Sequence, residues 1–147
     1  METIRCHYSK TPFFDMYFPW CEKVFNSDWN FLLDLSLETI QYLKGELKIN
    51  TPILRSSELG ELGNKTDRLI SICKQLGATQ YLSGDSARNY ISEKDFSDQG
   101  IELEYQEYQH PEYPQRYEGF VPFLSTIDLL FNCGDKSMEF LKQTDCV

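Results

Sequence analysis

Two short groups of polar side chains have the residue types of a phosphate-binding site. Each group stands where a helix or a tight turn is expected to begin, and backbone N–H groups at such points bind anions. Lysine and arginine add positive charge in both groups. The residues are Lys65, Thr66, Asp67 and Arg68 in the first group and Ser83, Gly84, Ser86 and Arg88 in the second.

The same residues also suit structural roles, and the sequence leaves both interpretations open. Thr66, Ser83 and Ser86 are common helix-capping residues, Asp67 suits a first helical turn, and Gly84 permits a tight turn. The sequence SGDS is far less specific than a Walker loop, and the chain contains no GxGxxG motif. The case for a phosphate site therefore depends on the two groups lying together.

His110 and Asp128 are the candidates for proton transfer. His110 stands in a proline-rich loop beside acidic and aromatic residues, where it could act as a general base near neutral pH. The alternative is that this loop is a rigid connector in which His110 bonds only backbone groups. Asp128 has a structural alternative as well, because its spacing from Ser125 is that of a capping box.

A strand, a helix and a second strand are expected between residues 51 and 84. Residues 51–57 form a short apolar run that ends in small polar residues, and residues 65–76 carry an apolar stripe with helical spacing. Gly77 should end that helix, and residues 79–84 should form the next strand. This order predicts a βαβ unit with two parallel strands.

A second crossover is expected to lead to a strand over residues 101–108. There Ile101, Leu103 and Tyr105 alternate with polar residues, so one face should be buried. The expected fold class is α/β, with a small, mainly parallel sheet built from βαβ units and flanked by helices. Ligands bind at the carboxyl ends of parallel strands, which would place the two polar groups in one crevice.

The remaining sequence predicts helices around this sheet in a single domain, residues 1–147. A helix should begin at Ser27 or Asp28, while Pro12 and Pro19 should divide the preceding aromatic segment into short pieces. Further helices are expected over residues 124–132, ended by Gly134, and over 136–143. Three strands are fewer than the roughly four to six that are usual. We therefore expect an incomplete sheet that another segment or another chain, such as a second copy, completes.

Composition excludes several function classes. The chain has 147 residues, and 14 basic against 23 acidic side chains give a formal charge of −9, which disfavours nucleic acid and anionic membranes as partners. The first residues lack the apolar segment of a signal peptide, and no apolar run approaches the about 20 residues that span a bilayer. We expect a cytoplasmic protein without membrane insertion.

The cysteines and histidines predict no metal site and no disulfide framework. The five cysteines are widely spaced without a CxxC pair, and the chain has two histidines. We expect all five cysteines to be free thiols, and we expect no cofactor.

Two segments carry a resemblance to the WbqC-like protein family. They are KTDRLISICKQLGATQYLSGDSARNYI, residues 65–91, and GIELEYQEYQHPEYPQRYEGFVPFLSTIDLLFNCG, residues 100–134. The resemblance is weaker but in register over residues 4–59. Members of the family usually begin with an additional segment rich in aromatic residues and proline, and Met1 falls inside the family pattern. The chain therefore resembles the carboxyl-terminal portion of such a protein.

The resemblance implies a bacterial protein of surface-polysaccharide (O-antigen) or amino-sugar biosynthesis, either a group transferase or an accessory protein. Its ligand would be a phosphate-bearing donor such as a nucleotide-linked sugar. The matched positions enter as candidates for the site: Lys65, Asp67, Arg68, Ser83, Gly84, His110, Gln115, Tyr117 and Asp128.

A rival interpretation is a noncatalytic scaffold module. The aromatic loop over residues 105–123 is rich in tyrosine, which is common at protein interfaces. The exposure of Tyr113, Tyr117 and Phe120 distinguishes the two interpretations. A flat exposed patch favours the scaffold, whereas burial of these rings against the core weakens it.

Overall fold

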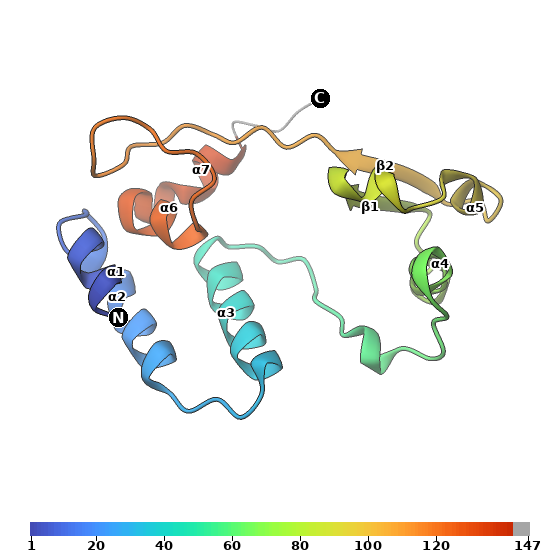
Figure 1. Ribbon diagram of the computed structural model, residues 1–147, viewed down its shortest axis with the longest axis horizontal. Coiled ribbons are helices and arrows are strands. Elements are labelled where there is room, and N and C mark those ends of the chain that lie inside the picture. The colour runs from blue at the N-terminus through green and yellow to red at the C-terminus, as the bar shows by residue number, and fades with distance from the viewer. Residues whose placement is uncertain (143–147) are drawn as a thin grey trace. The chain divides into compact units, whose positions relative to one another are not determined.

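The computed structural model describes residues 1–142. The chain forms two compact units, which we call the helical unit and the sheet unit. The helical unit combines residues 1–51 with the chain from Gln109 onward, and the sheet unit is Pro52–Tyr108 (Figure 1). Parts distant in the sequence therefore build the helical unit, whereas the sheet unit is one continuous segment.

The helical unit contains α1 (Glu2–Tyr8), α2 (Phe14–Asn26), α3 (Leu32–Glu46), α6 (Thr126–Cys133), the 3-10 turn η3 (Gly134–Lys136) and α7 (Ser137–Lys142). The sheet unit contains η1 (Ser56–Glu58), α4 (Lys65–Leu76), β1 (Gln80–Gly84), η2 (Asp85–Asn89), α5 (Glu93–Ser97) and β2 (Glu102–Gln106). In the described part of the chain, no helix is both long and apolar enough to cross a membrane.

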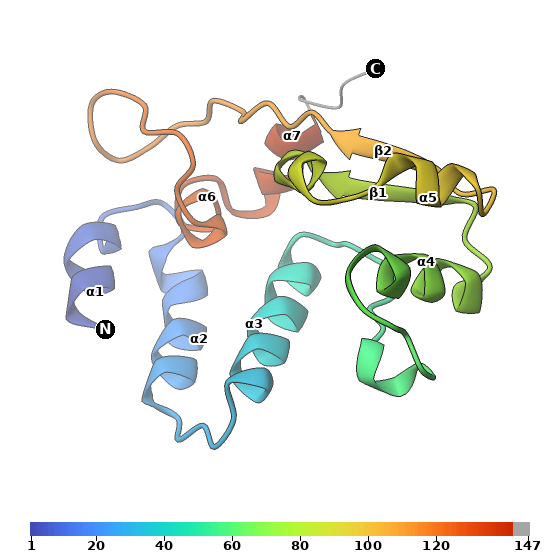
Figure 2. The same ribbon diagram turned by 45° about the vertical axis from the view of Figure 1, so that its right-hand side comes forward.

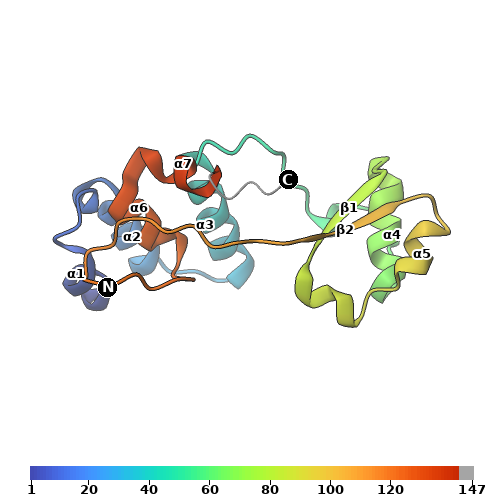
Figure 3. The ribbon, with the colours of Figure 1, turned by 90° about the horizontal axis from the view of Figure 1, so that it is seen from above.

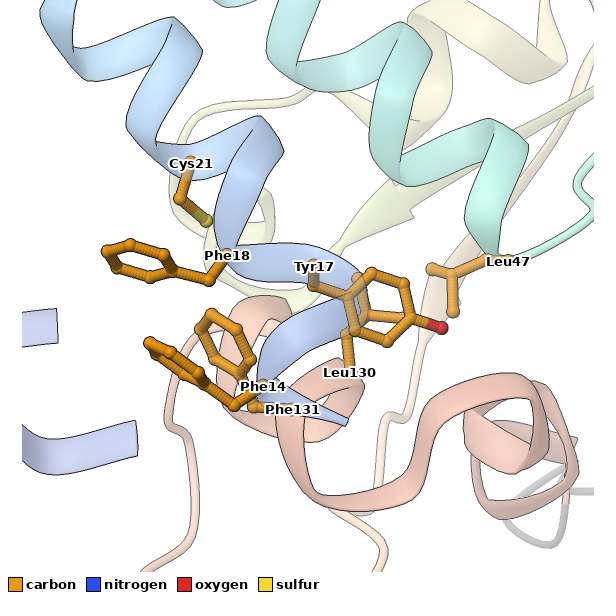
Figure 4. Close-up of a cluster of buried hydrophobic side chains, with 7 residues drawn as sticks. All are labelled: Phe14, Tyr17, Phe18, Cys21, Leu47, Leu130 and Phe131. Atoms are coloured by element: carbon orange, nitrogen blue, oxygen red, sulfur yellow. The ribbon is translucent and has the colours of Figure 1, made fainter. Parts of the chain in front are cut away.

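The core of the helical unit joins the amino-terminal aromatic residues to α6. Phe131 is fully buried, and its ring stacks on Phe14 and Tyr8 with centroid separations of 5.7 and 4.9 Å. Figure 4 shows the core cluster, in which side chains of α2 gather against α6. The cluster consists of Phe14, Tyr17, Phe18, Cys21, Leu47, Leu130 and Phe131. The aromatic side chains of Phe14, Tyr17 and Phe18 therefore pack in the core of this unit.

Two predicted helix boundaries in this unit are wrong. Pro19 does not divide the aromatic segment, because it lies inside α2. Ser27 does not begin the next helix but ends α2 in an extended conformation, with its N–H bonded to the Val24 carbonyl. The following helix, α3, begins at Leu32.

The sheet unit has one covered face. β1 and β2 pair in parallel with Gln80 opposite Glu102 and Gly84 opposite Gln106. Apolar side chains of α4, α5 and β2 share one buried cluster, and Figures 2 and 3 show both helices beside the strands. The helix predicted over residues 65–76 is confirmed, and Gly77 ends it with a φ of +66°. The alternation along β2 is also confirmed.

The strand predicted over residues 51–57 is wrong. Residues 51–55 have no regular structure, and η1 follows them. The physical reason is that Ile53 and Leu54 are exposed, so no burial of their side chains stabilises an extended conformation, and Pro52 has no N–H for a ladder. The α/β class fits the structure, but α4 is not the crossover between two parallel strands. Within residues 1–142 the sheet has two strands.

The cysteines in the described residues are free thiols of two kinds. Cys6 is exposed, whereas Cys21, Cys73 and Cys133 are buried. Burial raises the pKa of all three buried thiols, and that of Cys133 reaches about 11, with a further contribution from the Asp128 carboxylate. The fifth cysteine, Cys146, lies outside the described residues.

This difference predicts selective labelling. In a Cys146→Ser variant, a thiol reagent at neutral pH should modify Cys6 rapidly and the three buried thiols slowly, because reaction requires access and a thiolate. Mass spectrometry of digested protein identifies the modified residue. After denaturation without reductant, all four should react, and a smaller number would show a disulfide.

Candidate functional site

The helical unit contains a cavity of about 350 Å³. Residues of α1, of the loop before α6 and of α6 itself line it, and the volume lies within the usual range for small-molecule sites. Its apolar lining includes Ile4, Val121 and Leu124. Its polar lining includes His7, Tyr8, Gln115, Arg116, Tyr117 and Asp128. We therefore take this cavity as the candidate site.

Asp128 provides a buried carboxylate at the cavity. Only 4% of the residue is exposed, and its Oδ2 accepts hydrogen bonds from the Tyr113 hydroxyl at 2.8 Å and from Gln115 Nε2 at 3.1 Å. Asn132 Nδ2 donates to Oδ1 at 3.3 Å. Ser125 caps α6 by accepting from the Ile127 N–H, as its position predicts. Asp128 is thus held by side chains from the loop and from the next turn of α6.

Two tyrosines beside this carboxylate are held in their protonated form. The pKa of Tyr8 is raised to about 12, mainly by burial. The hydrogen bond to Asp128 and the charge of that carboxylate raise it further. Burial and the hydrogen bond to Asp128 also raise the pKa of Tyr113. Both side chains are therefore neutral hydrogen-bond donors at physiological pH.

Gln115 connects the loop to the carboxylate. Its Oε1 accepts from the Val121 N–H and its Nε2 donates to the Val121 carbonyl, both at 2.9 Å. This pair closes residues 116–120 into a compact turn, and the same Nε2 donates to Asp128. Gln115 therefore positions both the turn and the carboxylate.

The turn is also attached to α1. Arg116 Nη1 donates to the carbonyls of Cys6, at 3.0 Å, and of His7. The Tyr117 hydroxyl lies 3.3 Å from His7 Nδ1, and the Arg116 guanidinium lies 4.9 Å from the centroid of the Tyr117 ring. These contacts hold Arg116, His7 and Tyr117 at the cavity although about 110 residues separate them in sequence.

His110 does not line this cavity. Its Nδ1 lies 2.9 Å from the Pro111 carbonyl, which is the backbone contact that the structural alternative predicts. Its ring packs beside Tyr113, Phe120 and Phe123 at centroid separations of 6.0, 5.8 and 4.9 Å. A role for His110 in proton transfer stays a prediction.

The first predicted phosphate-binding group lies in the sheet unit, in the first turn of α4. Asn64, not Thr66, is the N-cap residue, and Lys65 has a φ of +48°. Arg68 Nη2 donates to the Ser56 hydroxyl at 3.1 Å. Asp67 contributes to a surface pocket of about 340 Å³ that residues of α4 and of the segment 95–99 line.

The second predicted group surrounds the end of β1. Ser83 is buried in β1, Gly84 ends this strand, and Ser86 is exposed in η2. Arg88 Nε donates to Asp85 at 2.6 Å, its guanidinium lies 4.0 Å from Glu107, and it covers the Tyr105 ring. The strand that was to bring the two groups together is absent, so their joint role as a phosphate site stays a prediction.

Three of the predicted site residues come together at the cavity: Gln115, Tyr117 and Asp128. Sequence patterns did not indicate four further partners in this network, which are His7, Tyr8, Tyr113 and Arg116. Arg116 could have been identified from the sequence, because it is the one lysine or arginine in residues 109–125. His7 and Tyr8 could not, because their contacts depend on segments that are distant in the sequence. Within residues 1–142, no group of three or more His, Cys, Asp or Glu side chains could hold a metal ion.

Comparisons with known proteins give a family and one relative. The sequence profile of the WbqC-like protein family matches residues 1–140. The chain is 37% identical over 97 residues to "Uncharacterized protein Rv1507c" of Mycobacterium tuberculosis. The aligned segment covers 65% of this chain and 42% of that protein, so the chain spans less than half of the relative's length. No solved structure gives a significant match to the chain.

Proposed function

Because the chain belongs to the WbqC-like protein family, we propose that it acts in bacterial surface-polysaccharide (O-antigen) or amino-sugar biosynthesis. It is a group transferase, or an accessory protein of one, that binds a phosphate-bearing donor such as a nucleotide-linked sugar. The observation that carries the proposal is the cavity in the helical unit, with the positioned Asp128 carboxylate in its wall.

The lining of the cavity suits a sugar. A carboxylate accepts hydrogen bonds from hydroxyl groups, and Tyr8, as a neutral phenol, donates them. The tyrosine ring and the apolar side chains of Val121 and Leu124 provide surfaces for the carbon-bound face of a sugar ring. Few polar groups among apolar ones are typical of small-molecule sites.

Asp128 is the proposed general base. It accepts the proton of an acceptor hydroxyl while the hydroxyl oxygen forms its bond to the transferred sugar carbon. The bond from that carbon to the donor's phosphate oxygen breaks at the same time, and the phosphate departs with the electron pair. Tyr113 and Gln115 keep the carboxylate in place, so its orientation does not depend on the ligand.

The exposure of the aromatic loop supports a ligand site over a scaffold. Tyr113 is buried with Leu129 and Cys133, and Phe120 packs against this cluster. Tyr117 is 58% exposed, but it borders the cavity. Two of the three rings therefore cover the core.

A thermal-shift screen against nucleotide-sugars tests this function. A ligand at about 100 times its dissociation constant should add roughly 2.7 kcal/mol to the free energy of unfolding. For a chain of this size that amounts to a rise in melting temperature of roughly 5–10 °C. We expect at least one nucleotide-sugar to produce such a shift.

A pair of tryptophan substitutions assigns the shift to the cavity. Leu124→Trp should fill the cavity and remove the shift, because Leu124 lines it and is partly exposed. Leu82→Trp, at an exposed position on β1, is the matched control and should keep the shift. The absence of a shift with every nucleotide-sugar, or its persistence in Leu124→Trp, would contradict the proposal.

A further inference from the structure

We propose that Arg116 and His7 form the anion subsite of this cavity and bind the phosphate of the ligand. This inference rests on the proposed function and deepens it, since it fixes which end of the donor lies where. It also locates the phosphate in the helical unit rather than at the residues that sequence patterns suggested.

Arg116 has a free edge suited to phosphate. A guanidinium carries five N–H donors, and the two carbonyls of α1 occupy those of Nη1. In the part of the chain that the structure describes, Nε and Nη2 retain three donors in the planar fork that binds phosphate bidentately. Within residues 1–142, Arg116 forms no ion pair with a carboxylate, including Glu118, which also lines the cavity. Its charge is therefore available to a ligand.

His7 adds a second donor at the same wall. The Tyr117 hydroxyl meets Nδ1, and in the tautomer in which this hydroxyl donates, the proton of the imidazole is on Nε2. Nε2 is then an N–H donor at the cavity that Arg116 also lines. Arg116 is bonded to the His7 carbonyl, and the Tyr117 hydroxyl meets the His7 ring, so both residues are attached to the same wall.

The charges in the cavity orient the ligand. The Asp128 carboxylate repels a phosphate, whereas Arg116 attracts it, so the phosphate should lie toward Arg116 and the neutral sugar toward Asp128. Arg88 in the sheet unit contrasts with Arg116, because Asp85 and Glu107 already balance its charge. Among the described residues Arg116 has no carboxylate partner, so in a chain of net charge −9 it should attract an anion more strongly than Arg88 does.

Isothermal titration with uridine diphosphate tests the subsite directly. Arg116→Gln should weaken binding about 10- to 100-fold, the usual effect of losing hydrogen bonds to a charged group. Arg116→Lys should weaken it less, since it keeps the charge but not the fork. His7→Asn should also weaken binding without removing an anchor of the turn, because the His7 carbonyl remains.

Two control variants complete the experiment. Arg5→Gln removes an arginine of α1 that pairs with Glu22 and should leave uridine diphosphate binding unchanged. The double variant Lys65→Ala/Arg68→Ala should also bind normally. Loss of binding in the double variant, or normal binding in both Arg116→Gln and His7→Asn, would overturn the inference.

The two proposals fail in distinguishable ways. A nucleotide-sugar shift that Leu124→Trp removes but Arg116→Gln leaves intact would support the proposed function and refute the anion subsite. Uridine diphosphate binding that Arg116→Gln weakens, with no shift from any nucleotide-sugar, would support the subsite and refute the sugar donor. A loss of uridine diphosphate binding in Arg116→Gln that comes with a lower melting temperature of the unliganded variant, while His7→Asn binds normally, would show that Arg116 acts through the fold and would overturn the subsite.

Discussion

Replacement of Gly134 by alanine should destabilise the helical unit by about 3 kcal/mol or more. Gly134 has a φ of +59° and a ψ of −131°, a conformation that is essentially restricted to glycine. An added Cβ would overlap three ring carbons of Phe13. The ring cannot retreat easily, because it packs against the core cluster and the Phe13 backbone is held by its N–H bond to the Phe131 carbonyl. Strain and overpacking therefore act together.

Urea denaturation of wild type and variant measures this effect. Gly45→Ala is a control within the same unit, since Gly45 is in α3 and a Cβ there would meet no atom within 4 Å. It should stabilise the protein by roughly 0.5–1 kcal/mol. Gly100→Ala separates the backbone contribution, because Gly100 has a φ of +70° but open space around it. A Gly134→Ala variant within about 1 kcal/mol of wild type would contradict the packing that the structure shows.

The break at Gly134 and the limits of α4 could be predicted because their signals are local. An apolar stripe followed by Gly77 defines α4 without knowledge of any other segment, and both the stripe and the stop are present in the structure. A strand requires a partner as well as a pattern. The apolar run at Ile53 and Leu54 resembled a strand, but both side chains are exposed, and the chain there remains irregular.

The start of α3 shows how one local signal can serve two elements. Ser27 and Asp28 resemble N-cap residues of the following helix. In the structure the Ser27 hydroxyl donates to the Lys23 carbonyl and the Trp29 indole N–H donates to the Val24 carbonyl, so both satisfy the end of α2. The sequence contains both possibilities, and hydrogen bonding to α2 decides between them.

The candidate site could be predicted only in part. Asp128 and Gln115 were found because they lie in segments with a family resemblance, whereas the role of Tyr8 depends on α1 meeting a loop more than 100 residues away. Local patterns contain no information on such contacts. The predicted phosphate crevice depended in the same way on a strand that the chain does not form.

The Asp128→Asn variant should lose group-transfer activity while it keeps its ligand. Removal of a general base typically lowers the rate by about 10²- to 10⁴-fold. Asparagine has nearly the shape of aspartate, and its Oδ1 can still accept from Tyr113, so we expect donor affinity within a few-fold of wild type. Single-turnover measurements with the nucleotide-sugar that gives a thermal shift separate these two quantities. A loss of donor affinity with an unchanged single-turnover rate would show that Asp128 only binds the donor.

The same variant has a spectroscopic consequence that requires no substrate. The charge of Asp128 contributes to the raised pKa of Tyr8, so its removal should move that pKa from about 12 toward the ordinary value of 10, although burial, the larger cause, remains. Ultraviolet titration of tyrosinate should therefore show earlier ionisation in Asp128→Asn, and a Tyr8→Phe background identifies the contribution of Tyr8. Glu46→Gln is the control, because Glu46 acts on Tyr42 and Tyr17 instead. An unchanged Tyr8 titration in Asp128→Asn would mean that the carboxylate does not face this hydroxyl, and the proposed arrangement of base and phenol at the cavity would be wrong.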